Sequence, residues 1–114
     1  MFPAKTRLRF INSVISNFSN VETDYWPKQL DEYVKITHAK IIVKGITTNL
    51  NLQNEINFKT VNETINEEVE FVFIMPNPKN MYINSQLVKE LCTLKKNLSS
   101  VVPKSIEKEV KEEV

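Results

Sequence analysis

The side chains that most often hold a metal ion are scarce in this chain. His38 is the one histidine and Cys92 the one cysteine among 114 residues. A zinc site needs several such ligands and an internal disulfide needs two cysteines. We therefore expect no protein-held metal and no internal disulfide, a cysteine usage typical of the cytoplasm.

Lys44 and Gly45 are better suited, by type and position, to hold a phosphate group. They directly follow the apolar run 39–43, and Gly45 is the only glycine in the chain. A lysine supplies positive charge, and a glycine lets the backbone approach a ligand closely. Each residue also has a plain structural interpretation, because a lysine that closes a strand is commonly solvated and a glycine commonly forms a turn. Residue type alone leaves both interpretations open.

The elements that must position these residues alternate between helices and strands. Hydrophobic periodicity predicts helices over 3–20, 26–34, about 50–64 and 84–91, and strands over 21–25, 39–43 and 69–75. The strand over 69–75 is expected to be covered on both faces, because its apolar run is almost continuous. The tail from Pro103 is expected to be a solvated helix or a frayed terminus. The apolar faces are predicted to consist of Leu8, Ile11, Ile15 and Phe18 in the first helix and of Leu30, Tyr33 and Val34 in the second.

Strands that alternate with helices in this way indicate βαβ units and a parallel sheet. Ligands bind such sheets at the carboxyl ends of the strands. The functional residues should therefore follow Tyr25, Val43 and Met75. The helix predicted after Met75 is expected to take Asn84 as its N-cap.

The composition narrows the classes of partner. Lys and Arg number 15 against 14 Asp and Glu, which gives a net charge of +1, without the basic excess typical of nucleic-acid binding. No apolar run approaches the ~20 residues of a membrane helix, and the first residues lack the apolar segment of a secretory signal. We expect a single cytoplasmic domain over 1–114, with no nucleic acid and no membrane as partner.

Two segments resemble bacterial phosphopantetheine adenylyltransferase. Residues 41–47, Ile-Ile-Val-Lys-Gly-Ile-Thr, are similar to the family pattern V-x-I-R-G-x-R. Residues 70–76, followed by residues 82–90, are similar to the family's x-V-F-L-M-P strand and its F-I-S-S-[ST]-x-V-[KR]-E helix entry. The similarity runs without gaps from Met1 to about Val110.

The resemblance implies a nucleotidyltransferase of coenzyme A biosynthesis. Such an enzyme transfers an adenylyl group from ATP, with Mg²⁺, to 4′-phosphopantetheine and forms dephospho-coenzyme A and pyrophosphate. The fold implied is a Rossmann-like α/β nucleotidyltransferase fold lacking its first two strands, which leaves about three parallel strands with flanking helices. The family also suggests a homo-oligomer, a hexamer.

The family's T-x-G-H motif, which follows its first strand, does not occur in these 114 residues. We therefore expect a missing N-terminal fragment and an inactive chain when it is alone. No residue is assigned a catalytic or metal-binding role.

The resemblance also assigns binding residues. For the substrate these are Leu30, which matches a contact to the pantetheine arm, and Lys44, which replaces the arginine that holds the substrate phosphate. Thr47 replaces a second arginine, which in the family reaches the ATP phosphates. The positions expected to contact ATP are Gly45, Ile46, Thr47, Glu55, Asn80, Met81, Tyr82, Ile83, Asn84, Ser85 and Gln86.

Two other interpretations remain open from the sequence. The chain is alternatively a catalytically inactive remnant or interaction subunit that keeps the α/β scaffold, which the departures at Thr47, Asn51 and Gln86 favour. A different nucleotidyltransferase-like binding module is the third. An in-frame stretch upstream of Met1 that encodes a strand followed by T-x-G-H would favour the enzyme, and its absence would favour the remnant.

Overall fold

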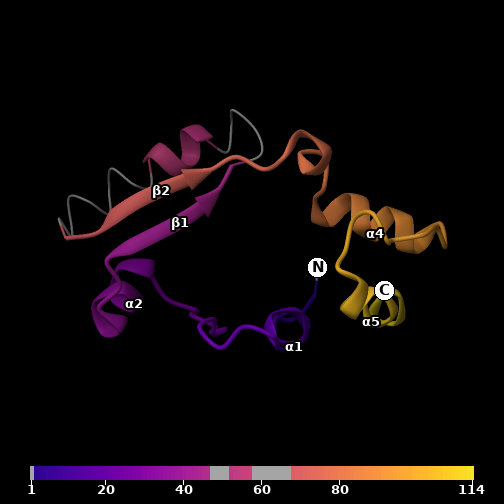
Figure 1. The fold of residues 1–114 in the computed structure, drawn as a ribbon, viewed down its shortest axis with the longest axis horizontal. Helices are drawn as coiled ribbons and strands as arrows, with labels where there is room; N and C mark the ends of the chain where they lie inside the picture. Colours follow the sequence, from indigo (N-terminus) through magenta and orange to yellow (C-terminus); the bar gives the residue numbers. More distant parts are fainter. Residues whose placement is uncertain (1, 47–51, 58–67) are drawn as a thin grey trace. The chain divides into compact units, whose positions relative to one another are not determined.

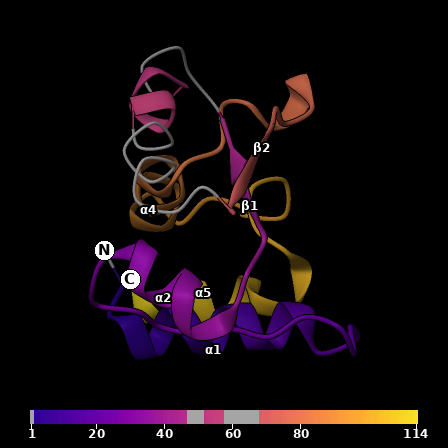
Figure 2. The same cartoon turned by 90° about the vertical axis from the view of Figure 1, so that its left-hand side faces the viewer.

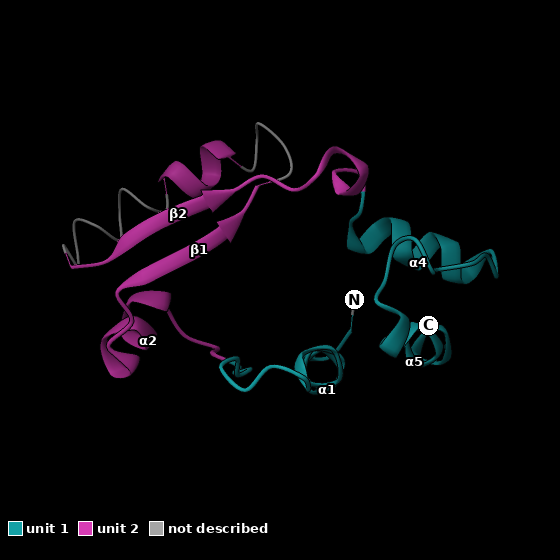
Figure 3. Ribbon diagram, viewed as in Figure 1, with its two compact units in different colours: residues 1–25, 83–114 teal, residues 26–82 magenta. Residues whose placement is uncertain are grey.

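The computed structural model describes residues 2–46, 52–57 and 68–114 (Figure 1). Residues 52–57 are helical. The chain divides into two compact units, one of residues 1–25 and 83–114 and one of residues 26–82 (Figure 3). The other elements are, in chain order, α1 (Ala4–Ile15), α2 (Leu30–Thr37), β1 (Ile41–Gly45), β2 (Glu70–Ile74), η1 (Pro78–Asn80), α4 (Ser85–Thr93), η2 (Lys104–Ile106) and α5 (Glu107–Glu113).

The two strands pair in parallel, and the helical segment between them lies in the crossover connection that parallel strands need. The register runs from Ile41 opposite Glu70 to Gly45 opposite Ile74. Backbone hydrogen bonds extend the ladder at both ends, from Glu70 N–H to Lys40 O (2.8 Å) and from Ile46 N–H to Ile74 O (3.0 Å). The predicted mixed α/β class and these two strands are therefore confirmed, with boundaries shifted by one or two residues.

One face of this sheet is half-buried and the other is exposed. Residues 52–57 lie on one side of the strands in both views of the ribbon (Figure 1, Figure 2). In each strand the exposed and half-buried residues alternate, and the exposed face carries Ile41, Val43, Val72 and Ile74. The expectation that β2 is covered on both faces is therefore wrong, because among the described residues only one face receives a helix.

Residues 21–25 do not form the third strand that the sequence predicts. A strand needs a ladder of backbone partners, and here side chains take local hydrogen bonds instead. The Tyr25 N–H donates to Asp24 Oδ1 (2.7 Å), and the Thr23 hydroxyl donates to Asn12 Oδ1 (2.6 Å). The described part of the chain therefore has two strands rather than about three.

The helix α2 begins at Leu30, later than the predicted start near Trp26. The Trp26 indole donates to the carbonyl of Gln29 (2.7 Å), which places the ring at the helix entry. The helix ends at Thr37, its C-cap residue His38 has φ 56°, and the Ala39 N–H donates to the Val34 carbonyl (3.3 Å). This is a left-handed helix stop that glycine usually provides.

The other unit is helical and contains the larger hydrophobic cluster. The helix α1 contributes Phe10 and Thr6 to the buried side, four residues apart, with Phe2 edge-on to Phe10 at 5.3 Å. Of the apolar face predicted for this helix, Ile11 and Phe18 are exposed and Leu8 and Ile15 are half-buried, so the predicted face is not the buried one. Two apolar stripes are present on α1, and packing against the rest of the unit selects the stripe that contains Phe10. The buried cluster consists of Phe10, Val88, Leu98, Val101, Ile106 and Val110.

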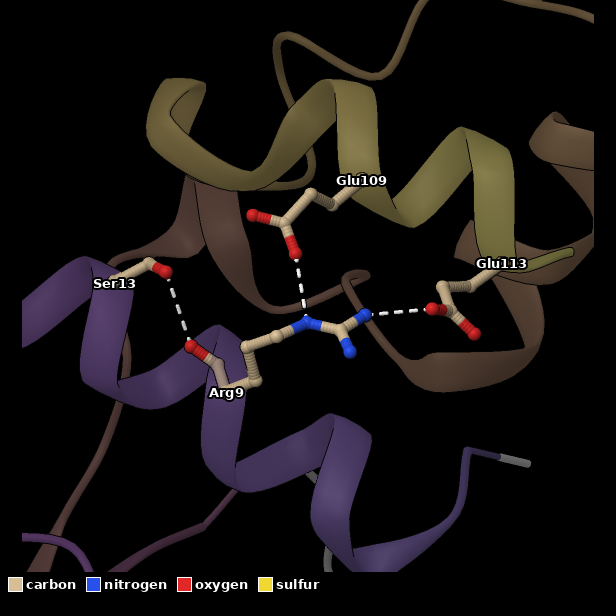
Figure 4. A network of polar contacts seen from close by, with 4 residues as sticks. All are labelled: Arg9, Ser13, Glu109 and Glu113. Atoms are coloured by element: carbon tan, nitrogen blue, oxygen red, sulfur yellow. Dashed lines mark hydrogen bonds and ion pairs between the residues drawn. The ribbon is translucent and has the colours of Figure 1, made fainter.

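The tail is part of this core, so the expectation of a solvated or frayed end is wrong. Ile106 and Val110 are 8% and 3% exposed. Arg9 in α1 reaches the carboxylates of Glu109 and Glu113 in α5, which hold its pKa above the ordinary value through hydrogen bonds (Figure 4). Charged residues of the tail thus form ion pairs with α1 as well as facing water. No helix in the described part of the chain combines the length and apolar character needed to cross a membrane.

Candidate functional site

Two predicted site residues, Lys44 and Glu55, are in direct contact. The Lys44 Nζ lies 3.1 Å from Glu55 Oε2, and the two side chains are 30% and 26% exposed. Lys44 is the fourth residue of β1, and Glu55 lies in the helical segment 52–57. The crossover between the strands therefore returns a carboxylate to the carboxyl end of β1.

The contact is an ion pair rather than a well-aligned hydrogen bond. Glu55 Oε2 is buried, and within the described residues it accepts no hydrogen bond of standard geometry. At the 3.1 Å separation the ammonium group attracts the carboxylate, and both groups are partly shielded from water. Lys44 thus provides an opposite charge beside a buried carboxylate oxygen.

Gly45 and Ile46 differ in what they offer a ligand. Gly45 ends β1, and a Cβ built on it would meet no atom within 4 Å, so the space beside its backbone is open. The side chain of Ile46 is 4% exposed and belongs to the interior. Of the two residues, Gly45 has the backbone access that its predicted role requires, whereas Ile46 offers a ligand only its backbone.

Leu30 is the first residue of α2 and is half-buried. It lies on the same helix as Val34, which is 4% exposed, so its side chain has at least a packing role. Thr47 and Asn51 lie outside the described residues. The predicted role of Thr47 in the nucleotide site therefore stays a prediction from the sequence.

Three predicted nucleotide contacts lie in the turn after β2. Asn80 ends the short helix η1, and the turn is closed by hydrogen bonds from Asn80 N–H to Asn77 O (2.8 Å) and from Met81 N–H to Pro78 O (3.3 Å). Met81 is 38% exposed and Tyr82 is 54% exposed. Exposed apolar and aromatic side chains after a parallel strand are available to pack against a base.

The remaining four residues, 83–86, belong to the helical unit. Ile83 packs against its core, and Asn84 caps α4 by accepting a hydrogen bond from Leu87 N–H (2.8 Å), as the sequence predicts. Ser85 opens the helix and is exposed, and the Gln86 amide donates to Glu90 Oε1 (3.3 Å). The Asn84 side chain thus has a structural role, whereas Ser85 leaves an exposed hydroxyl at the helix N-terminus.

Sequence reasoning identified Lys44 and Glu55 separately but missed their pairing. The two residues are 11 positions apart across a predicted strand-to-helix crossover, and no periodicity within either element links them. A signal was nevertheless present, because a βαβ crossover returns its helix alongside the strand that precedes it. Together the two residues provide a cation whose charge is already partly neutralised.

The comparisons with known proteins agree on one name. The chain is 35% identical over 103 residues to the phosphopantetheine adenylyltransferase of Caldanaerobacter subterraneus, a match covering 90% of this chain and 64% of the relative. It is 33% identical over 106 residues to the protein of that name from Alkaliphilus metalliredigens, covering 93% of this chain and 68% of the relative. A Helicobacter pylori phosphopantetheine adenylyltransferase is 31% identical over 106 residues, with the same coverage.

No family model matches the chain. It spans about two thirds of the length of the curated relatives, from 64% to 68% in these three. The matches extend over nine tenths of this chain, and they include both strands and the predicted binding segments. At this identity and coverage, the chain belongs to the phosphopantetheine adenylyltransferase family.

Proposed function

We propose that this chain carries substrate- and nucleotide-binding positions for adenylyl transfer from ATP to 4′-phosphopantetheine, in coenzyme A biosynthesis. The observation that carries the proposal is Lys44 beside Gly45 at the carboxyl end of a parallel strand. This is the place where α/β sheets bind ligands, and family membership gives the class of ligand.

In the proposed reaction, a phosphate oxygen of 4′-phosphopantetheine attacks the α-phosphorus of ATP. A new P–O bond forms at the α-phosphorus. The bond between the α-phosphorus and the oxygen that bridges it to the β-phosphorus breaks, and pyrophosphate leaves with that oxygen. Such transfers depend on positioning and charge stabilisation rather than on a covalent nucleophile. Lys44 would hold the phosphate of the acceptor, and Glu55 and the turn 80–82 would line the ATP side.

We propose that the complete site requires further strands from a Rossmann-like nucleotidyltransferase fold. The relatives are longer than this chain, and the exposed sheet face is unusual for a parallel sheet. The T-x-G-H motif is absent from the 114 residues. A polypeptide that supplies this motif and a neighbouring strand is therefore the proposed partner, together with ATP and 4′-phosphopantetheine.

Magnesium is proposed to arrive with the phosphates of ATP. The described residues contain no group of three or more His, Cys, Asp or Glu side chains that could hold a metal ion. Mg²⁺ is commonly bound through substrate phosphates with few protein ligands, so these residues need not hold it by themselves. A cytoplasmic location and a homo-oligomer, as a hexamer, are further proposals from family membership.

The test is the formation of dephospho-coenzyme A and pyrophosphate by the chain alone and by the chain mixed with the part of the Alkaliphilus relative that it does not match. We expect no turnover by the chain alone, since removing one preorganised donor already costs about 10²–10³ in rate. We expect turnover in the mixture. Robust turnover by the chain alone, abolished by Lys44→Ala, would contradict the need for a partner.

The assignment of Lys44 to the acceptor phosphate can be tested with a variant and a matched control. Lys44→Ala should weaken 4′-phosphopantetheine binding more than ATP binding, because its proposed partner is the acceptor phosphate. Lys40→Ala is the control, since Lys40 is an exposed lysine just before the same strand. Thr47→Arg should strengthen ATP binding instead. Equal effects of Lys44→Ala on both ligands would show that the acceptor phosphate lies elsewhere.

A further inference from the structure

Lys44 serves two roles that compete with each other. The proposed function needs its ammonium group to hold a phosphate, and the structure pairs the same group with Glu55 at 3.1 Å. A phosphate that binds Lys44 closely brings negative charge next to a carboxylate. Either the carboxylate moves away, or its repulsion weakens the binding of the phosphate.

Glu55 gains more from the pair than an exposed carboxylate would. Its Oε2 atom is buried and has no standard hydrogen bond among the described residues. A buried carboxylate oxygen without compensation is costly, so the loss of Lys44 would favour movement of Glu55 toward water. Glu55 lies in the helical segment 52–57, whose residues other than Glu55 are exposed. The Glu55 carboxylate therefore has water close at hand if it leaves Lys44.

We propose that Glu55 is a carboxylate gate for Lys44: anions bind at the carboxyl end of β1 by displacing the Glu55 carboxylate from Lys44 Nζ, so that the segment 52–57 loses this contact to the strand. The proposal rests on the proposed function and adds regulation of the same site by a residue of the crossover. It assigns Glu55 a role toward Lys44 in addition to the proposed position of Glu55 on the ATP side.

The exchange favours ligands that carry two negative charges. A singly charged anion offers Lys44 no more charge than Glu55 already does, whereas a doubly charged phosphate monoester offers more. Phosphate monoesters lose their second proton near pH 6, so they are dianions above neutral pH. The site is therefore suited to a terminal phosphate monoester and poorly suited to a phosphodiester.

Methyl phosphate and dimethyl phosphate are suitable probes, because they differ mainly in this charge. Binding to the 114-residue chain is followed by NMR chemical shifts at pH 8. We expect wild-type protein to bind methyl phosphate more tightly than dimethyl phosphate. We expect Glu55→Gln to bind methyl phosphate about fivefold more tightly than wild type, the factor that corresponds to about 1 kcal/mol for a partly exposed ion pair.

Two controls separate the gate from a general charge effect. Glu32→Gln removes one negative charge from α2, in the same unit, and should change the affinity by less than a factor of about two because Glu32 lies on a solvent-exposed position. Lys44→Met should abolish most of the binding, and adding Glu55→Gln to Lys44→Met should then have little effect. An equal gain from Glu55→Gln with and without Lys44 would overturn the proposal.

A measurement on wild-type protein covers the case in which Glu55→Gln disturbs folding. Amide hydrogen exchange over 52–57 should become faster when methyl phosphate binds, because the segment loses the contact between Glu55 and Lys44. Unchanged or slower exchange, or weaker methyl phosphate binding by a folded Glu55→Gln protein, overturns the gate. Absence of methyl phosphate binding to both proteins overturns it as well.

Failure of the gate is distinguishable from failure of the proposed function. If 4′-phosphopantetheine binds normally but Glu55→Gln does not bind methyl phosphate more tightly, the gate is contradicted and the proposed enzymatic function is not. If Glu55→Gln binds methyl phosphate more tightly but the complemented mixture shows no adenylyl transfer, the gate is supported and the proposed enzymatic function is contradicted.

Discussion

Arg9 and Glu113 are joined by a 2.6 Å hydrogen-bonded ion pair between residues 104 positions apart in the sequence (Figure 4). The Arg9 guanidinium also donates a hydrogen bond to Glu109, so one side chain of α1 binds two carboxylates of α5. We expect Arg9→Met to lower the thermal stability of the chain modestly, because all three side chains are partly exposed to solvent. Arg7→Met on the same helix is the control. Circular dichroism melts at low and high salt provide the measurement, and a loss that persists unchanged in high salt would show that packing, not charge, is responsible.

Leu98 should be the most sensitive aliphatic residue of the helical unit. Its side chain is 0% exposed, within the cluster that contains Phe10 and Val110. Leu98→Ala should reduce the free energy of unfolding by about 3 kcal/mol, since it removes buried methyl groups and leaves a cavity. Leu94→Ala is the matched control, because Leu94 is 65% exposed. Chemical denaturation measures both, and similar losses for the two variants would contradict the burial assigned to Leu98.

Lys95 occupies a backbone conformation that favours glycine. It has φ 53° after α4, and the Lys96 N–H returns to the Leu91 carbonyl (2.8 Å), as in a left-handed helix stop. Lys95→Gly should therefore raise the free energy of unfolding by up to about 1 kcal/mol, by relieving the strain of a Cβ at positive φ. Lys96→Gly is the control and should destabilise the chain, because a glycine there gains no such relief and adds freedom to the unfolded state.

Gly45→Ala separates folding from ligand binding. A Cβ at this position meets no atom within 4 Å, and the residue is not at positive φ, so the fold should tolerate alanine. If a ligand lies against this strand end, one added methyl group should weaken its binding by about tenfold. Calorimetric titration of the complemented chain with ATP and with 4′-phosphopantetheine tests this, alongside a melting curve. Unchanged affinity for both ligands would remove Gly45 from the site.

The lowered pKa of Glu107 should make the stability of the fold depend on pH. A hydrogen bond from Lys111 (2.9 Å) is the largest cause that holds the pKa of Glu107 below its ordinary value of 4.5. Because the folded-state pKa is the lower one, the stabilisation is fully present above the unfolded-state pKa and is lost as pH falls through the folded-state value. Lys111→Met should therefore be less stable than wild type at pH 6, and the two should converge as the pH falls below the folded-state pKa of Glu107. A difference that grows on acidification would contradict this sign.

The sequence by itself determined the features that depend on local chemistry and on short-range pattern. The Asn84 cap follows from an amide side chain before an apolar helical face, and its bond to Leu87 N–H is local. The strands over 41–45 and 70–74 follow from β-branched and aromatic runs bounded by glycine and proline. The motifs around Lys44 and Ser85 indicated the family, and relatives that are 35% and 33% identical over about nine tenths of the chain confirm it.

Tertiary structure decided which of several equally amphipathic patterns is used. The apolar side chains of α1 allow two faces, and only packing against residues far along the chain buries Phe10 and leaves Ile11 exposed. The tail around Val110 is charged enough to look solvated, yet it closes the same core. Residues 21–25 have strand-like composition but are not part of a strand in the described structure. The pairing of Lys44 with Glu55 depends on the path of the crossover between β1 and β2, and no local propensity encodes that path.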